Sequence, residues 1–406
     1  MTGADPFASE AGAKRYRRGT HRIRDPEATL AWLRPLLPAM GVTRLANLTG
    51  LDRVGIPVVA AYRPNARSLS VFQGKGLDLA AAKVSAAMEA VEAYHAEHVL
   101  QPLLLASADE MRPSRPLIDL AGLPPAPGGW DPGRQILWIE GRCLRSGAPL
   151  WLPYETVHLN HTLPLPTGSG CFASGSSGLG SGNTWSEAVL QALCELLERD
   201  ATARWARLSP AERDARAIDL TTVGNPDCRE LLDHFARAAV TVTAWDVTSG
   251  FGVPAFLCLV ADGAPDGGGD LADPEFGAGC HPSPAVALAR ALAEAAQVRA
   301  TVIAGARDDI PPDAYTPASR ARRRRKAAAV LPLGRPFRRF DVAAGWDSGT
   351  VPEDLDAVLA RLGDAGIDPV AVDLTRDGLG IPVVRTVAPG LLGPEWDTPE
   401  PPGAVR

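Results

Sequence analysis

Residues 177–200 read Ser-Gly-Leu-Gly-Ser-Gly-Asn-Thr-Trp-Ser-Glu-Ala-Val-Leu-Gln-Ala-Leu-Cys-Glu-Leu-Leu-Glu-Arg-Asp, in which a run of small residues leads directly into a helical pattern. Thr184 and Glu187 match a capping box, so we predict a helix from about residue 184 to 204. One face of it carries Glu187, Gln191, Glu195 and Glu198, and leucines fill the opposite face. The helix is therefore expected to pack through its leucines and to present a row of acids, although the capping box alone is enough to explain Glu187.

The loop before this helix consists mostly of small residues from Gly168 to Gly182. Free backbone N–H groups and the positive end of a helix dipole attract anions, so the loop predicts a phosphate site. It has neither the Gly-x-x-x-x-Gly-Lys-Ser/Thr pattern of a Walker loop nor the context of a dinucleotide-binding fingerprint. A flexible linker is the alternative interpretation, and the capping box at the end of the loop disfavours it.

A second acidic face is predicted on a helix over residues 78–98, where Ser85, Glu89 and Glu92 lie together. Alanine follows each glutamate four residues later, so no lysine or arginine at that spacing compensates the two charges. Magnesium prefers carboxylate and phosphate oxygens, and two such helices facing each other could hold more than one ion. The alternative is an ordinary solvated helix face.

A third helix, predicted over residues 283–301, places Arg290 and Glu294 on one face. An arginine can grip phosphate oxygens while a nearby carboxylate orients it. A surface ion pair is the alternative for this helix. In the same way, an ion pair between Glu195 and Arg199, four residues apart, is the alternative to a metal-binding role for Glu195.

The overall composition indicates a folded enzyme. The chain has 406 residues, of which 46% are hydrophobic and 22% charged, and its net charge of -6 gives no reason to expect nucleic-acid binding. Six cysteines without a Cys-x-x-Cys pair predict neither a zinc site nor a disulfide framework, and favour a cytoplasmic location. No apolar run is long enough for a membrane span or an export signal.

Three similar segments predict an α/β fold built from related strand-and-helix units. Each has a Gly-x-Pro start that leads into a β-branched or aromatic run, as proline does at the beginning of a strand. They are Gly55-Ile56-Pro57, Gly252-Val253-Pro254 and Gly380-Ile381-Pro382. The predicted organisation is a flexible basic tail (1–24), one continuous catalytic domain (25–392) and a proline-rich tail (393–406).

Taken together, these motifs resemble the YcaO family, and the resemblance runs from about Gly19 to Leu391. The segments that carry it include Gly19-Thr20-His21-Arg22, Gly74-Lys75-Gly76, Ser85-x3-Glu89-x2-Glu92, Asn183-x3-Glu187-x3-Gln191-x3-Glu195-x2-Glu198-Arg199-Asp200 and Arg290-x3-Glu294-x2-Gln297. Several separated motifs in the right order are more specific than any one of them. The resemblance implies a YcaO-type α/β fold of mixed sheets packed with helices, with ATP and Mg²⁺ bound without a Walker loop.

The resemblance also implies roles for individual residues. The metal ligands would be Glu89, Glu92, Glu195 and Glu198. The residues that bind the nucleotide, or orient groups that do, would be Ser85, Asn183, Glu187, Arg199, Arg290 and Glu294. The implied reaction is ATP-dependent phosphorylation of a backbone amide oxygen in a peptide or protein, and the motifs assign no catalytic acid or base.

Two features indicate which branch of the family this chain resembles. The alternating prolines that end azoline-forming members are absent, because Pro401-Pro402 is followed by Gly-Ala-Val-Arg, and Ala93 replaces the usual arginine after Glu92. The segments around Gly55 and Gly74 resemble members that act beside a TfuA partner in forming thioamides. We therefore expect a thioamide in a ribosomally made peptide or protein, and a TfuA-like protein that delivers sulfur.

Other functions stay open at this point. A side-chain nucleophile would give an azoline, and a backbone amine an amidine. A catalytically silent YcaO-like module that only presents a peptide is a third reading, which the retained acids disfavour, and an ATP-dependent ligase or kinase of another family is a fourth. The sequence leaves the oligomeric state open, with a homodimer among the alternatives.

Two further motifs are interpreted as structural. The basic run Arg320 to Lys326 is predicted to be a solvated face, with a dock for an acidic leader peptide or a ribosomal substrate as the alternative. His158 and His161 lack a supporting Glu or Cys pattern, so a shared metal is disfavoured.

Overall fold

The structure, a computed structural model of the chain, describes residues 12–262, 272–334 and 338–393. The helices are α1 (Pro26–Leu33), α2 (Leu79–Glu97), α3 (Ala108–Met111), α4 (Trp185–Ala206), α5 (Pro210–Asp214), α6 (Pro226–Arg237), α7 (Pro284–Ala304), α8 (Pro317–Ala328) and α9 (Val351–Asp364). The strands are β1 (Arg44–Asn47), β2 (Val58–Tyr62), β3 (Val71–Lys75), β4 (Leu103–Ala106), β5 (Ile136–Cys143), β6 (Pro149–Pro153), β7 (Leu179–Ser181), β8 (Ile218–Asp219), β9 (Val240–Asp246), β10 (Ala255–Asp262), β11 (Ala272–Cys280), β12 (Arg338–Arg339), β13 (Val370–Asp373) and β14 (Val383–Val387).

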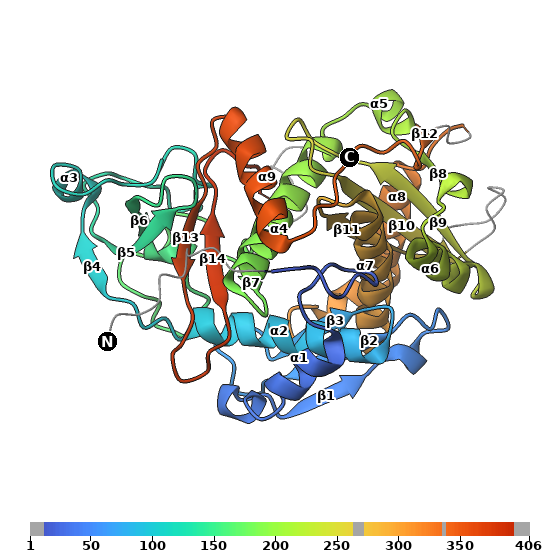
Figure 1. The fold of residues 1–406 in the computed structure, drawn as a ribbon, viewed down its shortest axis with the longest axis horizontal. Coiled ribbons are helices and arrows are strands. Elements are labelled where there is room, and N and C mark those ends of the chain that lie inside the picture. Colours follow the sequence, from blue (N-terminus) through green and yellow to red (C-terminus); the bar gives the residue numbers. More distant parts are fainter. Residues whose placement is uncertain (1–11, 263–271, 335–337, 394–406) are drawn as a thin grey trace.

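Three antiparallel sheets surround the long helices (Figure 1). One has the order β1-β2-β3, and a second has the order β11-β10-β9. The third has the order β4-β5-β13-β14-β7, and β6 also pairs with β5. In Figure 1 the third sheet lies to the left and the second to the right, and helices α2, α4 and α7 lie in the region between them. The short strands β8 and β12 form a separate parallel pair.

The predicted strand-and-helix units are present three times, as β3 with α2, β11 with α7 and β7 with α4. In each unit a glycine on the strand lets an alanine-rich stretch of the helix pack against the strand backbone. A Cβ added to Gly74 would lie 2.0 Å from the backbone nitrogen of Ala86, and one added to Gly180 would lie 2.2 Å from the carbonyl oxygen of Ala188. Both distances are far below van der Waals contact, so α2 and α4 can pack this closely only because Gly74 and Gly180 have no side chain.

The three Gly-x-Pro segments are strand entries, as predicted. Their glycines adopt left-handed backbone conformations, with φ of 74° at Gly55, 69° at Gly252 and 63° at Gly380. Only glycine adopts such angles at low cost, so each can turn the chain before the proline starts the strand. The strands that follow are β2, β10 and β14, one in each of the three sheets.

The N-terminal segment differs from its prediction. Residues 12–24 belong to the predicted flexible tail, but they pack against α9 and α4. Lys14 Nζ lies 2.5 Å from Asp354 Oδ2, with both side chains fully buried. The backbone N–H of Ile23 donates to Glu187 Oε1 at 2.7 Å. The reason is tertiary, because the partners of this segment lie more than 150 residues away in the chain. Residues 1–11 and 394–406 lie outside the described residues, so the two tails stay predictions there.

Candidate active site

The acidic faces of α2 and α4 and the Arg/Glu face of α7 meet at one place. Arg290 on α7 donates from Nη1 to Gln191 Oε1 on α4 at 2.7 Å. Ser181, at the end of β7, donates to Glu92 Oε1 on α2 at 2.8 Å. Lys75, at the end of β3, lies 2.6 Å from Glu294 Oε2 on α7. The three strand-and-helix units therefore converge on a single charged cluster.

The four predicted metal ligands are part of this cluster, and their pKa values show how strongly they interact. Burial raises the pKa of Glu92 to about 8, the Ser181 hydrogen bond opposes this, and the charges of Glu195 and Glu89 add to it. Burial, together with the nearby charge of Glu294, raises the pKa of Glu198 to about 7. The pKa of Glu89 is also raised, chiefly by burial. The carboxylates are thus close enough to disfavour one another's ionisation.

Three of the four predicted ligands make no direct ion pair among the described residues. In residues 12–262, 272–334 and 338–393, the ion pairs of the cluster involve Glu195 and Glu294, and none involves Glu89, Glu92 or Glu198. Glu89 accepts a hydrogen bond from the backbone N–H of Gln73 at 3.0 Å. Nearby cations act on these carboxylates only from a distance, Arg307 and Lys75 on Glu89, and Arg290, Lys75 and Arg199 on Glu198. Partly buried carboxylates without a direct ion pair suit a hard divalent cation, which prefers oxygen ligands. The donor set therefore fits Mg²⁺.

Glu195 makes the ion pair that the sequence left open. Arg199 donates to its Oε1 from Nη2 at 2.7 Å and from Nε at 3.1 Å. Both side chains are partly open, with 21% of Glu195 and 32% of Arg199 exposed. Because its second oxygen takes no part in this pair, Glu195 can still offer a ligand atom while Arg199 stays beside it.

Glu187 and Asn183 are placed together at the start of α4. Glu187 is completely buried, and its Oε2 accepts from the backbone N–H of Asn183 at 2.8 Å and from Asn183 Nδ2 at 3.0 Å. Its Oε1 accepts from the Ile23 N–H. Both carboxylate oxygens of Glu187 thus accept hydrogen bonds from groups of the protein itself, and these bonds orient Asn183 and the N-terminal segment. Thr29 donates to Asn183 Oδ1 at 2.9 Å and completes this arrangement.

Two cations of the cluster were missing from the predicted site. Lys75 pairs with Glu294, and Arg22 donates from Nη2 to Gln191 Oε1 at 3.3 Å, beside Arg290. Both lie in segments that carry the family resemblance, so a signal was available in the sequence. The predicted residue Ser85 is half-buried on α2, one turn before Glu89.

A second group of possible metal ligands lies nearby and is less suitable. Nitrogen and oxygen atoms of His21, His281 and Asp354 lie within 4.8 Å of one another. However, Asp354 already pairs with Lys14. His281 Nδ1 accepts from the Ser283 N–H at 3.0 Å, so its proton is on Nε2, which then cannot bind a metal. We interpret these residues as a buried polar network that anchors the N-terminal segment.

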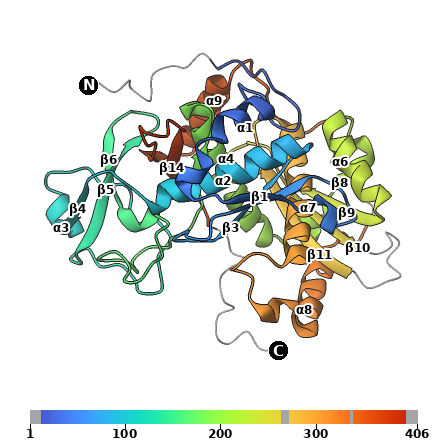
Figure 2. The same cartoon turned by 90° about the horizontal axis from the view of Figure 1, so that it is seen from below.

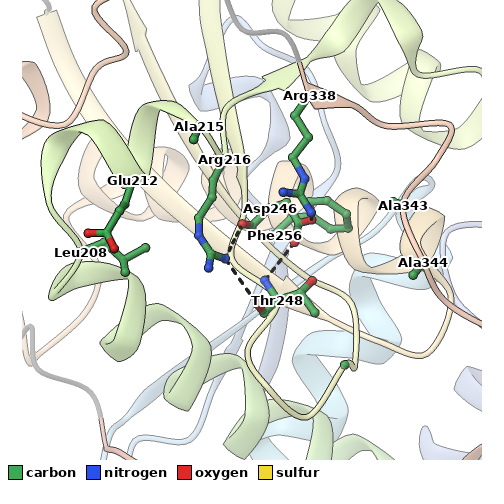
Figure 3. Close-up of a pocket in the computed structure, with 11 residues that line it drawn as sticks. Leu208, Glu212, Ala215, Arg216, Asp246, Thr248, Phe256, Arg338, Ala343 and Ala344 are labelled. Carbon is green, nitrogen blue, oxygen red and sulfur yellow. Dashed lines mark hydrogen bonds and ion pairs between the residues drawn. The ribbon is translucent and has the colours of Figure 1, made fainter.

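A cavity of about 450 Å³ lies elsewhere, and Figure 3 shows its lining. Arg338 Nη2 lies 2.7 Å from Asp246 Oδ2. Arg216 donates from Nη1 to the carbonyl oxygens of Asp246 and Thr248 at 3.3 and 3.4 Å. These groups largely satisfy one another, and none of the predicted site residues lines the cavity, so we do not place the active site there.

The sequence model of a family described as YcaO cyclodehydratase, ATP- and Mg²⁺-binding, matches residues 73–392. The chain belongs to the YcaO family. The family predicted from the sequence is thereby confirmed. The family's description also agrees with ATP and Mg²⁺ as the predicted cofactors.

Relatives of this YcaO protein extend over nearly its whole length. A Rhizobium leguminosarum bv. trifolii protein, described as an uncharacterized protein in the tfuA 3' region, is 38% identical over 390 residues, which are 94% of this chain and 90% of that protein. An uncharacterized protein of Methanothermobacter thermautotrophicus is 34% identical over 380 residues, which are 90% of this chain and 94% of that protein.

Solved structures share its fold. A heterocyclase in complex with substrate and cofactor matches 96% of this YcaO protein with a TM-score of 0.76 and 23% identity, and the chain spans 55% of that heterocyclase. YcaO from Methanopyrus kandleri, bound with AMPPCP and Mg²⁺, matches with a TM-score of 0.69 and 24% identity over 94% of both chains. The predicted α/β YcaO fold is confirmed, but the three larger sheets of the described residues are antiparallel and not mixed as expected, and only the short pair of β8 and β12 is parallel. Among the helices of the described ranges, none is both long and apolar enough to cross a membrane.

Proposed function

We propose that this YcaO protein uses ATP and Mg²⁺ to activate a backbone amide of a ribosomally made peptide or protein, and that the product is a thioamide. The observation that carries the proposal is the cluster of Glu89, Glu92, Glu195 and Glu198, of which Glu195 alone makes an ion pair within the described part of the chain. Such a cluster is costly unless a cation joins it, and ATP brings Mg²⁺.

The roles of the residues follow from their places in the cluster. The four glutamates would hold Mg²⁺ between α2 and α4. Bound Mg²⁺ would neutralise the charge that develops on the phosphoryl oxygens. Arg290 and Arg199 would bind phosphate oxygens beside the metal, while Glu294 orients Lys75 through their ion pair. Asn183, held by Glu187 just before α4, and Ser85, in the first half of α2, would contact the nucleotide.

The chemistry requires good positioning more than a strong acid or base. In the proposed reaction hydrosulfide adds to the amide carbon, and the amide oxygen then takes the terminal phosphoryl group while ADP leaves. The carbon–oxygen bond breaks last, so the oxygen departs as phosphate, the sulfur loses its proton and a carbon–sulfur double bond forms. Phosphate is a far better leaving group than an amide oxygen, and the cluster supplies the charge neutralisation that the transfer needs.

Two observations favour the thioamide over a ring product. The 38% identical relative is encoded in a tfuA region, and TfuA is the partner expected from the sequence. The chain also lacks the alternating proline ending of azoline-forming relatives. The likeness to a heterocyclase supports the azoline as the competing product. A TfuA-like sulfur-delivering partner and a peptide substrate complete the proposal.

Substitution of the α4 glutamates tests the ATP site. We expect Glu195→Gln and Glu198→Gln each to abolish ATP-dependent phosphate release and to leave the circular dichroism spectrum unchanged, because both side chains lie on the partly open face of α4. Turnover close to that of the wild type in either variant would remove the metal-ligand assignment.

The mass of the product tests the nucleophile. After co-expression with a neighbouring precursor peptide and a TfuA-like partner, a thioamide makes the peptide heavier, because sulfur replaces oxygen. Ring closure on a Cys, Ser or Thr side chain expels water and makes it lighter. A water-loss product formed without a sulfide source would overturn the thioamide and would leave the ATP site standing. Phosphate release without any modified peptide would contradict amide activation.

A further inference from the structure

Arg385, on β14, is a buried arginine whose charge is not directly paired in the described part of the chain. Its exposed fraction is 5%. Nη1 donates to the carbonyl oxygen of Gly175 in the Gly/Ser loop at 2.7 Å. Nε is buried without a hydrogen-bond acceptor, and no ion pair of Arg385 occurs within residues 12–262, 272–334 and 338–393. A guanidinium keeps its charge even when buried, and a buried charge is costly unless it is paired, so the environment of Arg385 favours binding of an anion.

His158 supplies a second buried donor. Its exposed fraction is 3%, and Nδ1 accepts from the Asn160 N–H at 3.1 Å, so the proton of the neutral ring is on Nε2. That Nε2 is buried and has no acceptor in the described part of the chain. Burial lowers the pKa of His158 to about 4, with smaller effects of His161 and Arg385, so the ring is neutral at pH 7. It therefore offers an N–H and not a second full charge.

Both donors lie on the face of the third sheet that α2 covers. Arg385 is paired with Leu179 of β7, and Ser181, two residues further along β7, points to the same face and donates to Glu92. Leu159, next to His158, donates its N–H to the carbonyl oxygen of Ala96, one turn after Glu92 on α2. The two donors thus border the acid cluster on the side of the Gly/Ser loop.

The position of Arg385 relative to the acids is informative. Burial lowers its pKa to about 10, and the largest opposing influence is the charge of Glu195. Glu195 itself bonds to Arg199 and not to Arg385. Arg385 is therefore near a predicted metal ligand but does not bond to it. The N–H groups of Arg385 stay available for a further anion between the Gly/Ser loop and the predicted metal site.

We propose that Arg385 and His158 form a phosphoryl-binding subsite, which contacts the oxygens of the terminal phosphate of ATP. This inference rests on the proposed function, because the anion belongs to the nucleotide. A phosphoryl group has enough oxygens to accept from both donors while its other oxygens bind Mg²⁺. As the amide oxygen bonds to the terminal phosphorus and the bond to the leaving ADP breaks, the charge stays on these oxygens, so both side chains act as donors and transfer no proton.

The affinities for two nucleotides test the subsite. Mg·AMPPCP carries a terminal phosphonate and Mg·ADP lacks it. We expect Arg385→Gln to weaken Mg·AMPPCP binding at least about tenfold in calorimetry, as the loss of a charge-assisted hydrogen bond predicts. Binding of Mg·ADP should change less than about twofold, because ADP does not reach the subsite. His158→Gln should show the same selectivity with a smaller loss, because a neutral donor contributes less.

Arg376 offers a matched control, because it is a half-buried arginine that also donates to a backbone carbonyl, that of His98, at 3.0 Å. Arg376→Gln should leave both affinities unchanged. Equal weakening of AMPPCP and ADP by Arg385→Gln, or no weakening at all, would overturn the subsite and leave the proposed function intact. If Arg385→Gln fails to fold, His158→Gln decides by the same comparison. A wild-type protein that binds neither nucleotide with Mg²⁺ would overturn the proposed function, and the subsite with it.

Discussion

The variant Glu92→Gln distinguishes the effect of the Glu92 carboxylate on the stability of the fold from its effect on metal and nucleotide binding. Glu92 is partly buried, makes no ion pair within the described residues and has a pKa raised to about 8. Glutamine has nearly the same shape and can still accept the Ser181 hydrogen bond. A shift from 4.5 to about 8 corresponds to roughly 5 kcal/mol of unfavourable interaction once the carboxylate is ionised, and relaxation of the partly exposed side chain toward solvent reduces this to about 2 kcal/mol. The metal-free variant should therefore be more stable than the wild type at pH 8.5.

The sign of the pH dependence follows from proton binding. Because the folded protein holds a proton on Glu92 up to about pH 8 and the unfolded chain releases it near pH 4.5, the contribution of Glu92 to the stability of the metal-free wild type should fall as the pH rises between these values. Glu92→Gln lacks this contribution, so its stability relative to the wild type should rise over this range. The remaining slope is common to both proteins: Glu89 and Glu198, with raised pKa values, add to it in the same sense, and four buried histidines with lowered pKa values oppose it below about pH 6.5, namely His21, His95, His158 and His281. The wild type should regain stability when Mg·AMPPCP is added, and the variant should not.

Thermal unfolding monitored by fluorescence, from pH 5 to 8.5 with and without Mg·AMPPCP, measures both effects. Glu140→Gln, at an exposed position on β5, is the control and should follow the wild type under all conditions. A metal-free Glu92→Gln protein that unfolds at a lower temperature than the wild type at pH 8.5 would refute the reasoning, because the carboxylate would then be stabilising the fold.

Three other predictions concern the nucleotide, the N-terminal segment and the close helix packing. ATP should stabilise the protein against heat only with Mg²⁺, by about 2.7 kcal/mol at 100 times its Kd, and equal stabilisation with excess chelator would count against the acidic site. Lys14→Met leaves the buried Asp354 without its cationic partner, so it should lower the free energy of unfolding by about 3 kcal/mol and increase proteolysis near residue 12. The Arg15→Met control, at an exposed position, should do neither. Gly180→Ala should reduce thermal stability strongly and shift the start of α4, because the new Cβ would lie 2.2 Å from the Ala188 carbonyl oxygen. The control Gly224→Ala, at a position with open space around it, should be tolerated. Equal unfolding temperatures of the two variants would exclude the tight contact at Gly180.

Local sequence determined the elements that carry the site. The start of α4 follows from Thr184, whose side chain accepts the N–H of Glu187, and the spacing of Glu195 and Glu198 puts both on one face because the helical period is local. The strand entries follow from glycines that adopt left-handed angles before a proline. Such features depend on the backbone conformation of neighbouring residues, so they can be predicted from one stretch of chain.

Only the tertiary structure decided which of those residues form ion pairs and hydrogen bonds with one another. The spacing of Glu195 and Arg199 allowed an ion pair but did not require it, and the partners of Glu187 include the N–H of Ile23, a residue of the predicted flexible tail. His158 and Arg385 lie more than 200 residues apart, and both border the site because β14 pairs with β7 under α2 and because Leu159, next to His158, donates to Ala96 of α2. The pKa of Glu92 is raised where α2 meets β7 and α4, because burial there acts together with the charges of Glu195 and Glu89 against the hydrogen bond from Ser181. Desolvation and charge pairing depend on distances through space, and the order of residues along the chain does not contain those distances.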